Sequence, residues 1–360
     1  MRIGILTFHR AHNYGAVLQC FALQQFLSYQ GHTVKVIDYN KRELWEYYSW
    51  YKVEEVRFAL SNPRKVLNRC VKLLDKWHKR IPRYYKFVWF QNYWLKLCSP
   101  SEIVHSPFDL VLIGSDQVWN TKITHGFDPY YWGQFVRPYS TKVATFAASL
   151  MGEWEEQDRP IVQKYLQSLD AISVREKSLA KVVARLFPLI NPIVVSDPVF
   201  LLSAQEWKRF AIDPKSKTPY VFFYQAKDSE TVYELSERIA QRIGKRLVVL
   251  SANVNGRNSE ECRNASPLEF IGWIRNADLV LTSSFHATAF SIIFQKRFFS
   301  FDLMEGEDNR IKDLLLLFGL ENRFICSTDE IDLSSFQEYD CSDSLKEFQN
   351  TAVHFVASLS

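Results

Sequence analysis

The sequence is short of the features that mark specialised classes of protein. No apolar run approaches the length of a membrane-spanning helix, and residues 1–7 are too short an apolar run for a signal peptide, so we expect a cytoplasmic protein. The six cysteines are scattered, without a CxxC pair or metal-ligand spacing, so we expect reduced thiols and no metal site. The glycine patterns of dinucleotide-binding and Walker-type loops are absent. A net charge of +4 is too weak to indicate nucleic-acid binding, although it suits a protein that handles anionic substrates.

The sequence does contain a regular alternation of predicted strands and helices. Residues 3–7 and 33–38 are predicted strands around a helix over 16–30, and the same alternation returns between 220 and 301. A chain of 360 residues exceeds what one hydrophobic core usually holds. We therefore expect an α/β fold with two Rossmann-like domains that face each other across a cleft. The predicted domains cover residues 1–200 and 201–340, with the boundary between 197 and 214, and a helix over 341–360 is expected to pack back on the first domain.

One region departs from this alternation. Residues 43–97 are rich in Lys and Arg, nearly free of acids after Glu55, and interleaved with Trp, Tyr and Phe. We expect Pro63 and Pro82 to divide the region into separate helical pieces. Its composition resembles that of an interfacial helix pair, which would give the protein a peripheral contact with an anionic membrane. An ordinary helical insert with a solvated basic face is the somewhat favoured alternative.

The first candidate site lies at the predicted start of a helix. In open α/β sheets ligands bind at the carboxyl ends of strands, and residues 282–288 follow a predicted strand over 279–281. Ser283 or Ser284 can cap the helix, and the free N–H groups there favour a phosphate or a carboxylate. His286 in that place can move protons near neutral pH. A capping or core histidine is an equally good interpretation of the pattern alone.

Two further strand ends carry polar residues. Arg175 directly follows a predicted strand over 171–174 and could make a bidentate contact with a carboxylate or phosphate, although a surface pair with Glu176 is the favoured alternative. In the segment 114–117, the glycine suits a close approach of the backbone to a ligand, and Asp116 could act as a base. An ordinary strand-ending turn explains the same residues.

Three more places have two interpretations each. Asn13-Tyr14-Gly15 could line a ligand site or form a turn. Asp197 before Pro198 is a helix cap rather than a ligand by default. Arg310 could reach the cleft, but a solvated helix start is the default.

Together these pieces resemble the polysaccharide pyruvyl transferase family, over residues 4–320. The insert at 43–97 carries none of the resemblance. The motifs that carry it, in order, are Asn13-Tyr14-Gly15-Ala16 with Gln19, Gly114-Ser115-Asp116-Gln117-Val118-Trp119-Asn120, Ser173-Val174-Arg175-Glu176, Asp197-Pro198 and Ser284-Phe285-His286-Ala287.

The resemblance implies a glycosyltransferase-B-like architecture and the transfer of pyruvate from phosphoenolpyruvate to sugar hydroxyls as a ketal. The acceptor would be a surface or capsular glycan precursor, free or lipid-linked, and phosphoenolpyruvate would be a co-substrate with no further cofactor. By motif position His286 matches the catalytic histidine and Arg175 the essential arginine, and Asp116 is the candidate base. The substrate-binding candidates are Asn13, Tyr14, Gly15, Gln19, Gly114, Ser115, Gln117, Asp197, Ser283, Ser284, Ala287 and Arg310.

The residues suit this chemistry independently. Phosphoenolpyruvate is an anion, so it needs cations and N–H donors, which Arg175 and the helix start near His286 can supply. His286 could protonate the phosphate or the methylene carbon, and Asp116 could accept a hydroxyl proton.

Other classes of function stay open. A nucleotide-sugar-dependent glycosyltransferase would have the same architecture, since a fold does not fix a function. A non-catalytic scaffold protein of a glycan-assembly complex predicts no turnover and an exposed apolar patch on the insert. An oxidoreductase is disfavoured because the glycine fingerprint is missing.

Overall fold

The computed structural model describes residues 1–61, 65–216, 218–302, 309–325 and 339–359. Its first sheet is parallel and has the strand order β3-β2-β1-β4-β5, which is the Rossmann order. Isolated bridges from Ala144 to Ala171 and from Ala148 to Val174 continue this sheet into the pair β6–β7. The strands are β1 (Arg2–Leu6), β2 (Thr33–Ile37), β3 (Leu97–Cys98), β4 (Phe108–Ile113), β5 (Ser140–Thr145), β6 (Ser173–Val174) and β7 (Ile193–Val194).

The second sheet is also parallel, with the order β12-β11-β10-β8-β9. The chain order reverses between β8 and β10, as it does between β1 and β4 in the first sheet. Ligands bind in the crevice outside the carboxyl ends of strands at such reversals. The strands are β8 (Tyr220–Gln225), β9 (Arg246–Ser251), β10 (Leu279–Thr282), β11 (Phe298–Phe301) and β12 (Phe324–Ile325).

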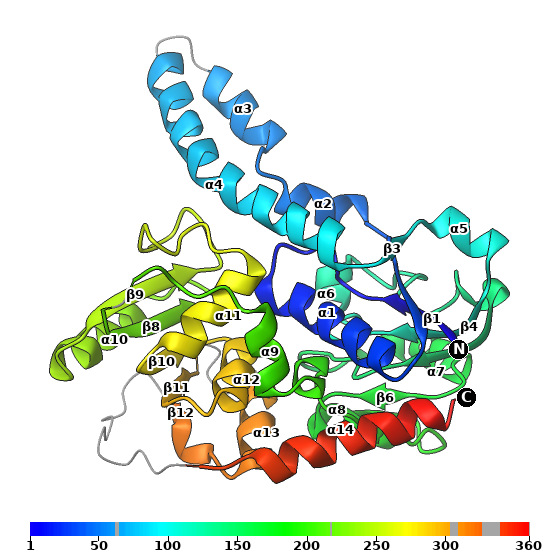
Figure 1. Ribbon diagram of the computed structural model, residues 1–360. Coiled ribbons are helices and arrows are strands. Elements are labelled where there is room, and N and C mark those ends of the chain that lie inside the picture. Colours follow the sequence, from blue (N-terminus) through cyan, green and yellow to red (C-terminus); the bar gives the residue numbers. More distant parts are fainter. Residues whose placement is uncertain (62–64, 217, 303–308, 326–338, 360) are drawn as a thin grey trace.

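Helices connect and cover both sheets, so the expected α/β fold with two Rossmann-like sheets is confirmed (Figure 1). Short β12 and the helices α5 and α9 were not expected from the sequence. The helices outside the insert are α1 (Tyr14–Tyr29), α5 (Pro100–His105), α6 (Thr121–Thr124), α7 (Arg159–Gln167), α8 (Lys177–Leu186), α9 (Ala204–Phe210), α10 (Glu230–Arg242), α11 (Pro267–Asn276), α12 (Phe285–Ile293), α13 (Asn309–Phe318) and α14 (Ser342–Ala357), with 3-10 turns η1 (Arg137–Tyr139), η2 (Glu156–Asp158), η3 (Pro198–Leu201) and η4 (Glu321–Arg323).

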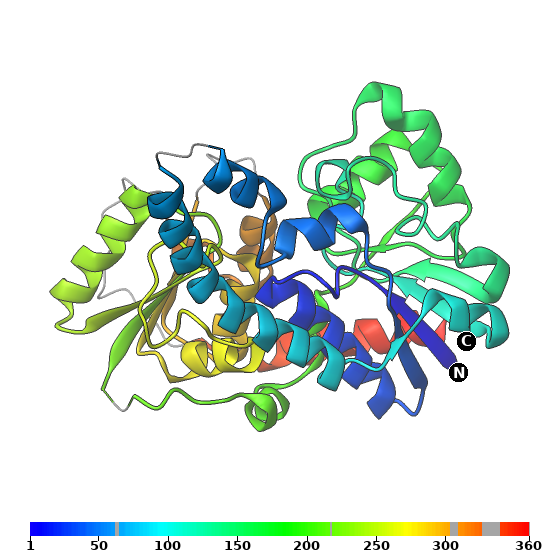
Figure 2. The same cartoon turned by 90° about the horizontal axis from the view of Figure 1, so that it is seen from above.

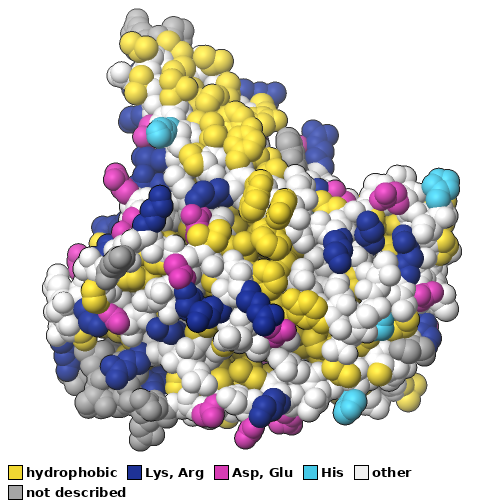
Figure 3. Space-filling view, viewed as in Figure 1, with side chains coloured by type: hydrophobic (Ala, Val, Ile, Leu, Met, Phe, Trp, Pro, Cys, Tyr) yellow, Lys and Arg dark blue, Asp and Glu magenta, His cyan; other side chains and the backbone are white. Residues whose placement is uncertain are grey.

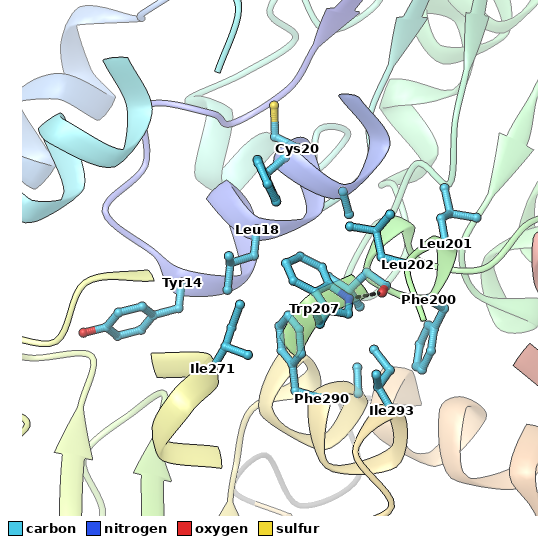
Figure 4. Packing of buried hydrophobic residues seen from close by; sticks show 14 of the residues in the cluster. Tyr14, Leu18, Cys20, Phe200, Leu201, Leu202, Trp207, Ile271, Phe290 and Ile293 are labelled. Carbon is cyan, nitrogen blue, oxygen red and sulfur yellow. Dashed lines mark hydrogen bonds between the residues drawn. The ribbon is translucent and has the colours of Figure 1, made fainter. Parts of the chain in front are cut away.

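One apolar core joins the first half of the molecule, which is built on the first sheet, to the second half, which is built on the second sheet. Helix α1 from the first half packs on α11 and α12 from the second, and the ring of Tyr14 stacks on Phe270 at 4.5 Å between centroids. Trp207 fills the middle of this core, where its indole N–H donates to the carbonyl oxygen of Val199 at 2.9 Å (Figure 4). A buried apolar contact of this kind fixes how the carboxyl ends of the two sheets face each other.

The last helix, α14, crosses from the second half to the first (Figure 1). The Phe355 ring lies 6.0 Å from that of Phe146, and the carbonyl oxygen of Leu359 accepts from the ammonium of Lys142 at 2.9 Å. The division into domains at residue 200 stays a prediction. Within the described ranges, no helix combines the length and apolarity needed to cross a bilayer.

The insert forms α2 (Arg42–Tyr48), α3 (Val53–Leu60) and α4 (Val66–Trp94), of which α3 and the first half of α4 project from the body while the second half of α4 packs on it (Figures 1 and 2). The expectation that Pro82 separates two helices is wrong, because α4 continues through it. A proline removes one helical hydrogen bond, at a cost of about 3 kcal/mol, and tertiary contacts offset this cost. The next residue, Arg83, donates to the carbonyl oxygens of Arg263 (2.6 Å) and Ser251 (2.7 Å) of the second half. Pro63 lies outside the described residues.

Candidate active site

Asp197 lies at the centre of a buried polar network. Its Oδ1 accepts from the backbone N–H of Val199 at 3.1 Å, so the expected cap is confirmed, here on η3. Its Oδ2 accepts from Arg175 Nη1 at 2.8 Å and from Ser115 Oγ at 3.3 Å, and lies 3.4 Å from His286 Nε2. Burial opposes ionisation of Asp197, but His286 and Arg175 outweigh it and hold the pKa of the carboxyl well below its usual range. Asp197 is therefore a carboxylate at neutral pH.

Arg175 follows β6 and is only 5% exposed, so the interpretation as a surface arginine is wrong. It does pair with Glu176, whose Oε1 accepts from Nε at 2.6 Å, and its Nη2 donates to Ser149 Oγ at 2.9 Å. The guanidinium carbon lies 4.2 Å from the centre of the Phe285 ring. Burial lowers the pKa of Arg175, but the carboxylates of Glu176 and Asp197 outweigh it and raise the pKa above its ordinary value. The cation is permanent and each of its nitrogens already donates to a protein oxygen.

Glu176 is a site residue that is not among the predicted candidates, although it belongs to the family motif and is the expected partner of Arg175. It is buried, and its Oε1 also accepts from Ser149 Oγ at 2.8 Å. Its Oε2 has no hydrogen-bond partner among the described residues. Burial raises the pKa of Glu176 in spite of the Arg175 charge beside it. The two carboxyls on either side of Arg175 therefore have pKa values displaced in opposite directions, an arrangement that separates acid from base roles.

His286 occupies the first turn of α12, directly after β10. Ser284 is the cap, since its Oγ accepts from the Ala287 N–H at 3.5 Å, so His286 is not needed for capping. The imidazole is 8% exposed and lies between Asp197 and Gly15. Its Nε2 lies 3.4 Å from Asp197 Oδ2, within ion-pair range, and has no other partner among the described residues. A buried imidazole beside a carboxylate can carry a proton.

The segment after β4 supports this network. Gly114 has φ +110°, and a Cβ there would stand 2.6 Å from the carbonyl oxygen of Phe146, so the close approach that requires glycine is to the backbone of the neighbouring segment. Ser115 Oγ donates to the Ala147 carbonyl oxygen at 2.9 Å as well as to Asp197. Asp116 is half-buried, and its Oδ1 accepts from the N–H of Gln117 at 2.9 Å. Asp116 makes no hydrogen bond to Arg175, but its charge contributes to raising the pKa of Arg175.

The residues of the first motif take structural positions around the same point. Asn13 caps α1, accepting from the Gly15 N–H at 3.0 Å. Gln19 joins two strand ends, because its amide donates to Thr7 Oγ1 at 2.9 Å and accepts from the Ser115 N–H at 3.3 Å. Tyr14 belongs to the apolar core, and its hydroxyl donates to the Ala265 carbonyl oxygen at 2.9 Å.

The remaining candidates are divided between the two halves. Ser283 Oγ accepts from the N–H of Ala226 at 3.3 Å and so ties the β8 and β10 strand ends together. Gln117 accepts from Asn120 at 2.8 Å, and Ala287 is fully buried in α12. Arg310 is brought to the network, since it lines a small pocket together with Arg175, Glu176, Asp197 and Phe285.

Two cavities flank the network. The small pocket beside Arg310 has room for about 20 Å³, enough for about one water molecule. A much larger cleft of about 560 Å³ lies between the insert and the second half, and Asn13 is part of its wall. No sequence pattern indicates that insert residues line a cavity, because that depends on where α4 docks.

A model of the family described as polysaccharide pyruvyl transferase matches residues 13–303, a span that includes Arg175, Asp197 and His286. The match covers well over half of the chain, which makes the protein a glycan-modifying transferase. It belongs to the polysaccharide pyruvyl transferase family. No curated protein matches the chain in sequence.

Solved structures of similar fold share little sequence with the chain. The UDP-N-acetylglucosamine 2-epimerase from Rickettsia bellii is 8% identical, with 99% of this chain and 96% of that chain covered and a TM-score of 0.45. The UDP-GlcNAc 2-epimerase from Neisseria meningitidis bound to UDP-GlcNAc is 12% identical, covering 98% and 100%, with a TM-score of 0.43. The S. aureus MnaA–UDP co-structure is 12% identical, covering 83% and 78%, with a TM-score of 0.44. At these values the likeness is one of fold only.

Proposed function

We propose that the protein transfers pyruvate from phosphoenolpyruvate to two hydroxyls of one sugar, forming a ketal on a precursor of a surface or capsular glycan. The observation that carries the proposal is the position of His286, whose Nε2 lies 3.4 Å from the Asp197 carboxylate that also binds Arg175. Proton carrier, carboxylate and permanent cation are thus joined at the carboxyl ends of the two sheets, where substrates of this fold bind. Family membership supports the same reaction.

The reaction needs protons moved in both directions. The methylene carbon of phosphoenolpyruvate gains a proton and becomes a methyl group, and C2 takes on positive charge. One sugar hydroxyl oxygen bonds to C2, the C2–O bond to phosphate breaks, and the second hydroxyl oxygen takes its place. Of the two hydroxyl protons released, one balances the proton on the methyl carbon and the other leaves with inorganic phosphate. A side chain that can both donate and accept a proton suits this sequence, and the imidazole of His286 is such a group.

Arg175 and Glu176 have a matching role in the proposal. A bound anion that meets the guanidinium shares it with the two carboxyls and with the Ser149 hydroxyl. Glu176 is the one to be displaced, because burial raises its pKa, whereas His286 and Arg175 hold the pKa of Asp197 low. Arg310 lines the same pocket and adds a second cation for the phosphate, whose binding requires the pocket to open beyond its present room of about 20 Å³. Asp116 accepts a hydroxyl proton from the acceptor in this scheme.

The experiment is to incubate the purified protein with phosphoenolpyruvate and a galactoside, and to follow inorganic phosphate together with the mass of the sugar. The proposal predicts phosphate release that depends on the sugar, matched by a sugar product heavier by one pyruvate less one water. If the protein turns over a nucleotide sugar but does not turn over phosphoenolpyruvate, it is a glycosyltransferase instead. A protein inert toward every donor would be the scaffold.

The insert supports a second part of the proposal, a peripheral contact with an anionic membrane. The hairpin (residues 53–80, α3 and the first half of α4) has eight basic and three acidic residues, which leaves 36 basic and 37 acidic residues in the rest of the chain. On the face seen in Figure 3, apolar side chains gather on the projecting helices. Clustered basic residues next to exposed apolar ones suit an anionic bilayer surface, and like charge disfavours pairing with a second hairpin. The exposed apolar residues are Val53, Phe58, Leu60, Leu67, Val71 and Leu74.

A further inference from the structure

The large cleft has walls from three parts of the chain. The insert provides one wall through α2, the α2–α3 connection and the middle of α4. The segments that follow β8 and β9 provide the opposite wall, and the cap of α1 closes one end. We call this cavity the insert cleft. Its volume of about 560 Å³ falls within the range of small-molecule sites.

The insert cleft adjoins the His286 network on two sides. Asn13 lines the cleft and caps α1, and Gly15 two residues later touches the imidazole. On the opposite wall, the N–H of Ala226 donates to Ser283 Oγ at 3.3 Å, three residues before His286. A ligand in the cleft therefore lies beside the proposed reaction centre without occupying the pocket of Arg175 and Arg310.

The chemistry of the walls suits a sugar. Tyr48, Trp50 and Tyr84 line the cleft, and aromatic rings offer flat apolar faces with polar edges, which C–H faces of sugars contact. Ser49 also lines it; this residue is 6% exposed, and its hydroxyl has no hydrogen-bond partner among the described residues. A buried hydroxyl without a partner is costly unless a ligand satisfies it.

The charge of the walls suits an anion. Four of the lining side chains are basic and one, Asp228, is acidic. The lining residue His12 is neutral, because burial and the nearby Arg10 lower its pKa to about 3. Arg80 shares its charge with Glu55, whose Oε2 lies 2.6 Å from Nη1. The excess of cations remains and favours a phosphate or carboxylate on the ligand. The basic lining residues are Lys52, Arg80, Arg83 and Lys227.

We propose that the insert cleft is the acceptor subsite, and that it binds a sugar carrying a phosphate. This rests on the proposed pyruvyl transfer, in which phosphoenolpyruvate occupies the Arg175 side and the sugar hydroxyls reach His286 from the cleft side. The aromatic residues contact the ring, Ser49 binds a hydroxyl, and the positive charge of the basic residues holds the phosphate, although Arg83 and Lys52 also donate to backbone carbonyl oxygens. The insert thereby determines which acceptor is used, although it carries none of the family motifs.

The test measures sugar binding without turnover. Saturation-transfer NMR is recorded on the full-length protein with hexoses and N-acetylhexosamines, each free and as the 1-phosphate. Tyr84→Ala is compared with Tyr93→Ala, which removes an exposed tyrosine of the same helix outside the cleft. Ser49→Ala is a second cleft variant that removes a single oxygen, in case Tyr84→Ala lowers the melting temperature. Quenching of tryptophan fluorescence by phosphoenolpyruvate reports donor binding separately.

The proposal predicts that the 1-phosphate binds more tightly than the free sugar. It further predicts that Tyr84→Ala or Ser49→Ala weakens binding of the sugar phosphate by about tenfold or more, with Tyr93→Ala and donor quenching unchanged. Unchanged binding in folded cleft variants, or no preference for the phosphate, would overturn it. Loss of phosphoenolpyruvate turnover with sugar binding intact would instead count against the proposed reaction alone.

The phosphate on the acceptor could belong to a soluble or a lipid-linked sugar, and one further arm separates these. A hexosyl diphosphate prenol in detergent micelles is compared with the hexose 1-phosphate. Tighter binding of the prenol derivative identifies a lipid-linked acceptor, and equal or weaker binding identifies a soluble one. Both results agree with the proposed recognition of a phosphate by the cleft. If neither the prenol derivative nor the hexose 1-phosphate binds, the proposal is overturned.

Discussion

Gly15 lies directly against the imidazole of His286. A methyl group on Gly15 would stand 1.9 Å from Nδ1 and 2.2 Å from Cγ of the ring. The first turn of α1 and the first turn of α12 thus meet at one point, and the catalytic candidate fills the space that a side chain would take. Glycine at a helical position normally costs about 1 kcal/mol relative to alanine, so its presence here is explained by the ring it accommodates.

This contact predicts that Gly15→Ala changes stability in opposite directions in the wild-type protein and in a His286→Ala background. In the wild-type protein Gly15→Ala displaces the ring, lowers the free energy of unfolding by about 1–3 kcal/mol and impairs transfer. In a His286→Ala background the same change has room, and should raise stability by up to about 1 kcal/mol. Urea unfolding of the four proteins measures both effects. An equal effect of Gly15→Ala in both backgrounds would show that the contact does not govern position 15.

The ion pairs of Arg175 predict a large loss when the cation is removed. Arg175→Met leaves the buried carboxyls of Asp197 and Glu176 beside each other without a counter-ion, and should cost about 3–5 kcal/mol of unfolding free energy. Arg159→Met is the matched control, because its pair with Glu156 at 2.6 Å is exposed and should be worth less than about 1 kcal/mol. Denaturant unfolding at pH 7 tests this. Similar losses for both variants would contradict the buried role of Arg175.

His12 predicts a pH dependence of stability. Its ring lies 5.1 Å from that of Phe87 and nearly parallel to it, and burial lowers its pKa from 6.5 to about 3. The unfolded chain binds this proton below about pH 6.5 and the folded protein does not, so stability is full above that pH and falls as pH drops toward 3. His12→Phe keeps the ring contacts and should remove about 1–3 kcal/mol of the loss between pH 7 and 4.5. An unchanged loss in His12→Phe, by urea unfolding at the two pH values, would refute this assignment.

The hairpin predicts a salt-sensitive attachment to anionic vesicles. Each basic residue near such a surface contributes about 1 kcal/mol, so binding should be strong to vesicles with phosphatidylglycerol and weak to phosphatidylcholine alone. Leu67→Glu and Leu74→Glu should abolish flotation, whereas Leu189→Glu, at an exposed leucine outside the hairpin, should not. Flotation that persists in the hairpin variants, or a change of oligomeric state in solution instead, would rule out the membrane as the partner.

Much of the fold follows from local sequence, because strands and helices here have clear apolar periodicity and capping residues. The helix predicted over 16–30 is observed as α1, Tyr14–Tyr29, with Asn13 as its cap. Pro82 was mispredicted because local preference was overruled by the anchoring of α4 on the second half. A proline in a helix interior is disfavoured locally but tolerated where tertiary contacts are strong.

The candidate site is predictable only in part, because it too depends on tertiary contacts. Strand ends identified Arg175, Asp197 and His286 as polar residues at the edges of the sheets, but their separation in sequence conceals that one carboxyl joins them. Gly15 beside His286 and the cleft beside Tyr84 depend on contacts between the two halves and the insert. Such contacts are set by packing over long sequence distances, which no local pattern encodes.

The most direct test of the account is sugar-dependent release of phosphate from phosphoenolpyruvate by four proteins. These are the wild type, His286→Ala, Arg175→Ala and the control His354→Ala, which removes an exposed histidine of α14. The account predicts that the wild type and His354→Ala turn over alike, and that His286→Ala is slower by about a hundredfold or more. Arg175→Ala should lose transfer as well, with folding of each variant checked by circular dichroism. Folded His286→Ala and Arg175→Ala proteins with full pyruvyl transfer would contradict it.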